Sequence, residues 1–183
     1  MIYDFTLQQV SFVLGLLYIL SHGYVLLQPK QAEKFLLAAP RHAALGVGLM
    51  VLATLWFTWL MVNVDLMEWH HLRRIFVIAG LVGGVLVVIY MKELLTGRAL
   101  GVLLLLAAYV LLDAAFLRDE PLKLLVVVNA YAYVIAGMFL AASPYYLRDV
   151  LSLFYRDPRW MPVAAGAGVV WGGVLLVLAC WVF

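Results

Sequence analysis

Charged side chains are scarce in this chain, and the middle third of each of its long apolar stretches has none. Only 12% of the 183 residues are charged and 67% are hydrophobic, whereas soluble domains contain about 25% charged and about 45–50% apolar residues. A soluble fold of this composition would leave much of its apolar surface in contact with water. The scarcity of charge therefore excludes a water-soluble fold.

Cysteine is almost absent, and the common catalytic motifs are missing. Cys180 is the only cysteine, which excludes an intrachain disulfide and a thiolate metal cluster. The sequence has no nucleophile elbow, phosphate-binding glycine loop, Cys-x-x-Cys pair or His-Glu-x-x-His motif. It therefore indicates no enzymatic reaction, and we predict no cofactor. The 12 Lys and Arg residues are spread over the connections, which argues against nucleic-acid binding.

Long apolar stretches fill most of the chain. A helix that crosses the hydrocarbon core needs about 20 mostly apolar residues, because its backbone amides must be paired within the segment. The sequence predicts an all-α, polytopic membrane protein in which residues 1–183 form a single transmembrane domain. The six predicted spans are residues 8–27, 42–63, 75–91, 99–117, 122–142 and 162–182.

The basic residues predict the orientation in the plasma membrane. The first, third and fifth connections carry eight Lys and Arg residues, while the second and fourth carry four. Cytoplasmic connections are enriched in these residues. We therefore expect connections 28–41, 92–98 and 143–161 on the cytoplasmic side and both termini outside.

A repeated pattern links the first and fifth connections. When Pro29 is aligned with Pro144, apolar residues in both segments follow the i, i+3, i+4, i+7 spacing of one helix face. Such segments are typical of short amphipathic helices that lie in the headgroup layer. The apolar positions are Ala32, Phe35, Leu36 and Ala39 in the first segment and Leu147, Val150, Leu151 and Phe154 in the second.

We interpret this pattern as a duplication of two-helix hairpins. Tyr18 and Tyr133 each stand eleven residues before the aligned proline. The hairpin at about 8–63 and the hairpin at about 122–182 are then copies, and the hairpin at about 75–117 is a shortened relative.

Paired glycines suggest a different symmetry. Gly83-Gly84 and Gly172-Gly173 interrupt the third and sixth spans at matching places, as in the inverted repeats of transporters. Close helix packing through small-xxx-small faces explains the same glycines. Packing is the simpler explanation, because neither half offers the polar side chains that a site at mid-membrane depth needs.

Two histidines and one polar connection are candidates for ligand binding. His22, about one turn inside the first span, and His42, at the start of the second, are weak candidates for haem ligands. The structural alternative is a neutral His22 that shares hydrogen bonds with Ser21, Tyr24 or a headgroup phosphate. Segment 65–74 is a weak candidate for binding Zn²⁺ or sensing protons, against a simple surface turn. Its candidate residues are Asp65, Glu68, His70 and His71.

Two further polar residues lie inside predicted spans. Asp113 lies one turn inside the fourth span, where we expect a local ion pair with Arg118 or, alternatively, an ion entry site. Asn129 stands four residues before Tyr133 on the fifth span, and we expect it to hydrogen-bond a neighbouring helix.

The sequence supports three hypotheses about function. The first is a non-catalytic accessory or scaffolding subunit of a larger membrane complex, whose partners are the lipid bilayer and other membrane subunits or a second copy. The second is a small transporter or channel for a weakly polar or lipid-like solute. The third is a haem-binding or redox membrane protein. The transport hypothesis has as lining candidates Tyr18, His22, Asp113, Asn129, Tyr133, Gly84 and Gly173.

Overall fold

A computed structural model describes residues 3, 5–120, 122–157 and 159–181. Across this part of the chain the regular structure is helical, without strands. Within these described ranges six helices are long and apolar enough to cross a membrane, which confirms the predicted all-α fold with six candidate spans. They are α1 (Leu7–Leu27), α3 (Ala43–Asn63), α4 (Arg73–Tyr90), α5 (Leu95–Ala115), α6 (Lys123–Ala142) and α8 (Trp160–Trp181).

Four shorter helices connect them: α2 (Pro29–Ala38), η1 (Ala39–Arg41), η2 (Met67–Leu72) and α7 (Tyr145–Arg156). Most boundaries lie close to the predicted ones. The largest difference is at α5, which begins at Leu95 and takes Arg98 into its first turns. Thr96, one turn before the apolar run, is 1% exposed. The first turn of α5 is therefore buried against the rest of the protein, although it lies outside the hydrophobic segment.

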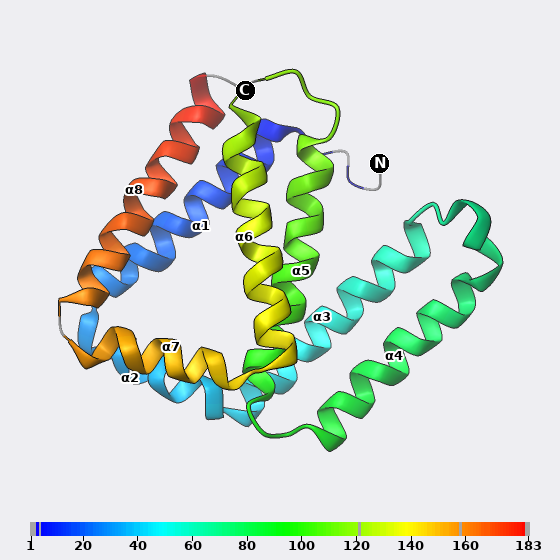
Figure 1. Ribbon diagram of the computed structural model, residues 1–183, viewed down its shortest axis with the longest axis horizontal. Coiled ribbons are helices and arrows are strands. Elements are labelled where there is room, and N and C mark those ends of the chain that lie inside the picture. Colours follow the sequence, from blue (N-terminus) through cyan, green and yellow to red (C-terminus); the bar gives the residue numbers. More distant parts are fainter. Residues whose placement is uncertain (1–2, 4, 121, 158, 182–183) are drawn as a thin grey trace.

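The packing order of the long helices differs from their order in the sequence (Figure 1). Helix α1 packs antiparallel to α8, α5 packs against both α6 and α3, and α4 packs against α3. The contacts of α3 with α4 and of α5 with α6 join helices that are neighbours in the sequence. The other two main contacts, α1 with α8 and α3 with α5, join helices that are not consecutive. The largest buried cluster joins α1, α5, α6 and α8; it consists of Leu7, Val10, Leu14, Leu111, Ala114, Ala115, Val126, Ala130 and Leu175.

The short helices α2 and α7 explain why α1 does not pack along α3, nor α6 along α8. Both run across one end of the long helices (Figure 1). At 1.5 Å per residue, a crosswise helix of ten residues separates its neighbours by about 15 Å, whereas packed helix axes lie about 8–10 Å apart. The space between them is taken by other helices. Because α1 is paired with α8, the start of α2 lies near the end of α7, and the two short helices pack antiparallel.

Glycine allows the closest helix contacts. A Cβ at Gly15 would lie 2.8 Å from the Gly172 carbonyl oxygen, and a Cβ at Gly172 would lie 2.8 Å from the Gly15 carbonyl oxygen. The same holds for Gly101 of α5 and Gly137 of α6, where a Cβ on either glycine would lie 2.8 Å from the carbonyl oxygen of the other. Direct backbone contact of this kind is the usual function of small residues between helices in lipid.

The Gly-Gly pairs of α4 and α8 are used asymmetrically. Gly84 faces Thr54 of α3, and Gly172 faces Gly15 of α1, whereas Gly83 and Gly173 have no atoms within 4 Å of an added Cβ. Both helices continue without interruption through these pairs. One glycine of each pair therefore serves close packing, as the small-residue interpretation expects.

We predict that Gly101→Ala lowers the free energy of unfolding by about 1–3 kcal/mol, the usual range for overpacking. The added Cβ would lie 2.6 Å from the Ala141 amide nitrogen and 2.8 Å from the Gly137 carbonyl oxygen, and neither backbone atom can move independently of its helix. Thermal unfolding in detergent, followed by circular dichroism, measures the change.

Gly48→Ala is the matched control, because Gly48 lies in α3 with nothing within 4 Å of its added Cβ. Alanine is a better helix former than glycine by about 1 kcal/mol, so this variant should be unchanged or more stable. Equal melting temperatures for the two variants would contradict the close α5–α6 contact.

Candidate functional site

A hydrogen bond between α1 and α6 brings together two of the predicted polar candidates. The Tyr18 hydroxyl donates to Asn129 Oδ1 at 3.0 Å, and Asn129 is 5% exposed. Tyr133, one turn along α6, packs with Tyr18 against the main buried cluster. The expectation that Asn129 bonds a neighbouring helix is therefore met. Its Nδ2 atom is buried without a partner among the described residues.

His22 extends this polar group toward the α2 end of α1. Its ring stacks on Tyr18, with centroids 5.3 Å apart and planes inclined by 14°. Nδ1 lies 3.0 Å from the Tyr18 carbonyl oxygen and 3.1 Å from Ser21 Oγ. The ring occupies the space that a Cβ on Gly168 of α8 would need. His22 thus shares a hydrogen bond with Ser21, as expected, and its other main partner is the Tyr18 carbonyl rather than Tyr24.

His42 has a different environment, at the beginning of α3. Its Nδ1 accepts a hydrogen bond from the Leu45 amide at 3.2 Å and so caps the helix. The side chain is exposed. The suggestion that His22 and His42 hold a haem together stays a prediction.

An apolar groove of about 470 Å³ begins next to the polar group. Tyr133 lies on its wall, and the segment before α1 closes another side through Tyr3 and Phe5. Trp56 Nε1 donates to the Tyr3 hydroxyl at 2.6 Å. The remaining lining comes from α1, α3 and α5: Gln9, Val10, Val13, Leu14, Leu17, Trp56, Ala107, Val110 and Leu111.

Nothing in the sequence pattern connects Tyr3 with Trp56. The two residues are 53 positions apart, and tyrosine near a span end is normally explained as an interfacial anchor. The rings of Trp59 and Tyr109 also lie near Tyr3, with centroids 5.2 Å and 6.1 Å away. These aromatic rings come together because α3 packs on α5.

Asp113 does not form the expected ion pair with Arg118. Its Oδ2 instead accepts a hydrogen bond from the Tyr3 amide at 3.4 Å. Arg148 with Asp149 is the one salt bridge found within the described ranges. The expectation was based on sequence distance alone, whereas the N-terminal segment returns to α5 and brings a backbone donor to the carboxylate.

Segment 65–74 forms an exposed turn around η2. Asp65 Oδ1 accepts from the Met67 amide at 3.0 Å, and His71 Nδ1 lies 3.1 Å from the Glu68 carbonyl oxygen. The contact between Glu68 and His71 therefore involves the Glu68 backbone carbonyl, and the Glu68 carboxylate takes no part in it. No group of three potential metal-binding side chains is found in the described part of the chain. The Zn²⁺ or proton-sensing role of Asp65, Glu68, His70 and His71 stays a prediction.

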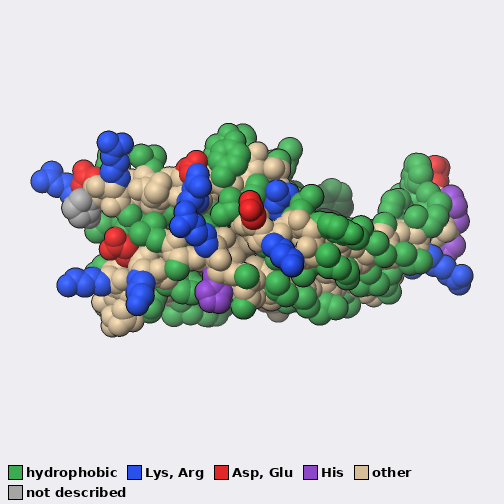
Figure 2. Space-filling model, turned by 90° about the horizontal axis from the view of Figure 1, so that it is seen from below, with side chains coloured by type: hydrophobic (Ala, Val, Ile, Leu, Met, Phe, Trp, Pro, Cys, Tyr) green, Lys and Arg blue, Asp and Glu red, His purple; other side chains and the backbone are tan. Residues whose placement is uncertain are grey.

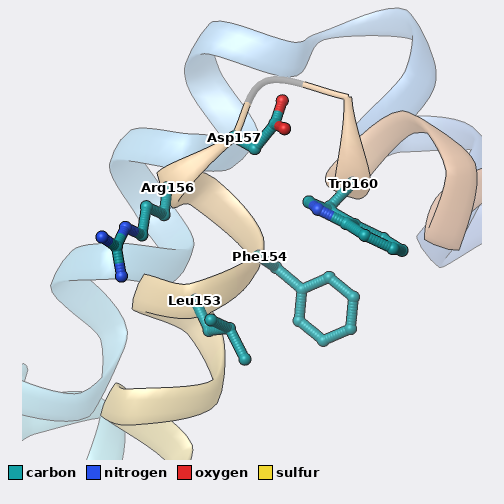
Figure 3. Close-up of a pocket in the computed structure, with 5 residues that line it drawn as sticks. All are labelled: Leu153, Phe154, Arg156, Asp157 and Trp160. Carbon is teal, nitrogen blue, oxygen red and sulfur yellow. The ribbon is translucent and has the colours of Figure 1, made fainter.

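A second cavity, of about 610 Å³, lies at the corner between α7 and α8 (Figure 3). Phe154 and Trp160 lie on one side of it, while the Arg156 guanidinium points away from these rings. Asp157 Oδ1 accepts from the Arg159 amide at 3.0 Å and so shapes the turn. The apolar spacing of α7 included Phe154, but it gave no sign of a cavity here.

The contact of α2 with α7 affects one tyrosine outside the long helices. Burial raises the pKa of Tyr155 on α7, and the carboxylate of Glu33 on α2 raises it further. Both causes favour the neutral phenol.

No protein-family model, curated protein sequence or solved structure matches this chain. The candidate sites are therefore supported by their geometry alone.

We predict that Tyr18 and Asn129 are energetically coupled. Tyr18→Phe leaves Asn129 Oδ1 buried without its donor, and Asn129→Ala removes the acceptor. In a double-mutant cycle the coupling energy should be about 0.6–1.7 kcal/mol, the range for polar contacts between membrane helices. Unfolding of the four proteins in bicelles measures it.

Tyr131→Phe is the control for loss of a hydroxyl on α6, because Tyr131 is 57% exposed. It should leave stability unchanged. Strictly additive effects of Tyr18→Phe and Asn129→Ala would show that the hydrogen bond contributes nothing.

Proposed function

We propose that this chain is a non-catalytic subunit of a larger membrane complex and that α4 is its docking surface. The observation that supports this most is the position of α4, which extends with α3 to one side of the other helices (Figure 1). Helix α4 packs against α3 and η2, and none of its residues is buried. It is thus the long helix that its own chain covers least.

The sequence of α4 is suited to two close neighbours. Gly80 and Gly84 face Phe57 and Thr54 of α3. Ala79 and Gly83 form a second small-xxx-small pair on the next face of the helix, where Gly83 has nothing within 4 Å of its added Cβ. Each glycine lowers intrinsic helix stability by about 1 kcal/mol. A second helix packed closely at Ala79 and Gly83 would offset that loss.

We predict that Gly83→Leu removes the partner subunit. Wild-type protein purified from its native membrane in mild detergent should carry a stoichiometric companion, identified by mass spectrometry. Leucine at position 83 blocks a close backbone approach, so the companion should be lost while the melting temperature of the chain itself stays the same or rises.

Gly166→Leu is the matched control, because Gly166 on α8 is also open to its surroundings. This variant should retain the companion. Loss in Gly166→Leu but not in Gly83→Leu would place docking elsewhere, and a wild-type protein without any companion would contradict the subunit role. Gly84 is unsuitable here, because a side chain at that position would displace Thr54 within the chain itself.

Transport of a lipid-like solute is the second candidate function, and the groove beside Tyr133 favours it. Its volume of about 470 Å³ falls within the range of about 300–1,000 Å³ typical of small-molecule sites. Tyr18, Asn129, His22 and Tyr133 form one group at its edge, while Asp113 lies beside Tyr3. Gly84 and Gly173 lie outside the groove lining.

We predict for this alternative that Ala107→Trp stops transport, since the larger side chain would fill the groove. Transbilayer movement of a fluorescent phospholipid in proteoliposomes, followed by dithionite quenching, should fall to the rate of protein-free vesicles. Ala132→Trp, at an exposed position of α6, should leave the rate unchanged. A wild-type rate equal to that of protein-free vesicles would contradict this function for the probe used.

We further propose that α2 and α7 lie in the cytoplasmic headgroup layer of the plasma membrane and are copies of one duplicated element. The end of the molecule that carries them has eight basic and four acidic residues, whereas the connections at the other end have four of each. Figure 2 shows Lys and Arg side chains gathered over this face. Such asymmetry favours the cytoplasmic side for α2 and α7.

We predict that Lys34→Cys and Arg156→Cys, each in a Cys180→Ser background, react with a membrane-impermeant maleimide only after the inner face is opened. Cys180 is exposed and must be removed first. Labelling of either position in intact cells would contradict the proposed orientation. Labelling of the two positions from opposite faces would contradict the contact of α2 with α7.

A further inference from the structure

We propose that the cleft between η1 and α7 binds the phosphate of an anionic phospholipid through Arg41 and Arg148. This inference depends on the placement of α2 and α7 in the headgroup layer. It does not depend on the subunit role, so the two can fail separately. The cleft has a volume of about 270 Å³ and is lined by Leu37, Pro40, Arg41, Arg148, Leu151 and Ser152.

The antiparallel packing of α2 and α7 creates this cleft. The end of α2 continues into η1, where Pro40 is buried and Arg41 follows it. The first turns of α7 lie opposite and bring Arg148 to the other side of the same space. Two guanidinium groups from distant parts of the sequence therefore flank one opening.

Both arginines have donors available for an anion. Arg41 forms no side-chain hydrogen bond or ion pair with the residues that the structure describes. Arg148 reaches Asp149 Oδ1 with Nε at 2.9 Å and Nη2 at 2.8 Å. These two side chains are 49% and 51% exposed, and a surface pair of this kind contributes about 0–1 kcal/mol. A phosphate can therefore compete with Asp149, and the planar guanidinium fork suits two phosphate oxygens.

The walls of the cleft favour a lipid over a soluble anion. Leu37, Pro40 and Leu151 supply apolar surface beside the arginines, and Leu151 belongs to the apolar face of α7. A cleft of about 270 Å³ has room for a glycerol phosphate group, and the acyl chains of the lipid would lie outside it. These chains would continue along the apolar faces into the hydrocarbon.

The surrounding charge favours an anionic headgroup over a zwitterionic one. Lys30 and Lys34 lie on α2, the short helix that contributes Leu37 to the cleft, with Glu33 between them. The face as a whole has twice as many basic as acidic residues. A choline group would bring an additional positive charge next to two guanidinium groups, whereas a glycerol headgroup brings none.

Native mass spectrometry of the purified protein tests this proposal. The protein is titrated in detergent micelles with phosphatidylglycerol or with phosphatidylcholine of the same acyl chains. We expect phosphatidylglycerol to bind about tenfold more tightly, and Arg41→Gln with Arg148→Gln to abolish that preference. The double variant Lys30→Gln with Lys34→Gln has the same net charge but an intact cleft, and it should retain the preference.

Equal losses in the two double variants would overturn the proposal, because they would indicate diffuse charge instead of a defined site. Equal binding of both lipids by the wild-type protein would also overturn it. Inorganic phosphate is the soluble control: displacement of phosphatidylglycerol at equal concentration would show a free-phosphate site. If the double variant Arg41→Gln with Arg148→Gln fails to fold, the double variant Arg41→Lys with Arg148→Lys replaces it. Lysine keeps the positive charge but lacks the planar guanidinium that can bind two phosphate oxygens. Unchanged affinity in that variant would contradict recognition by the guanidinium groups.

Discussion

The close backbone contact between α1 and α8 is the constraint on which the rest of the fold depends. It joins the first and last long helices, and it is possible because Gly15 and Gly172 have no side chains. Lipid is as apolar as leucine, so hydrophobic burial contributes little to helix association and close van der Waals contact contributes more. Helices α1 and α8 meet α5 and α6 in the largest buried cluster. The Tyr18–Asn129 hydrogen bond then joins α1 to α6, while His22 stacks on Tyr18 one turn away on α1 itself.

The two crosswise helices α2 and α7 set the spacing of the long ones. They separate α1 from α3 and α6 from α8, so α1 and α8 pack on each other, while α3 and α6 both pack on α5. Helix α4 lies at the outer edge of this arrangement, with α3 as its main partner (Figure 1). None of its residues is buried, although α3 itself is packed on α5.

The sequence predicted the number, type and approximate limits of the long helices, because hydrocarbon imposes a length and a composition that can be counted. It also predicted that Asn129 would bond another helix and that paired glycines would serve packing. It could not predict which helices pair, since all six stretches are similarly apolar. The predicted partner of Asp113 was wrong for a related reason, because Arg118 is near in sequence whereas the Tyr3 amide is near in space. The groove and the Arg41–Arg148 cleft were missed because each is formed by segments far apart in the chain.

Tyr3 has a consequence that extends beyond its own contacts. Its hydroxyl bonds Trp56 of α3, its amide bonds Asp113 of α5, and its ring closes the groove beside α1. The position of this segment and the occupancy of the groove are therefore thermodynamically linked. A ligand that contacts Tyr3 in the groove stabilises this position of Tyr3, and by reciprocity displacement of Tyr3 weakens the binding of that ligand by the same factor.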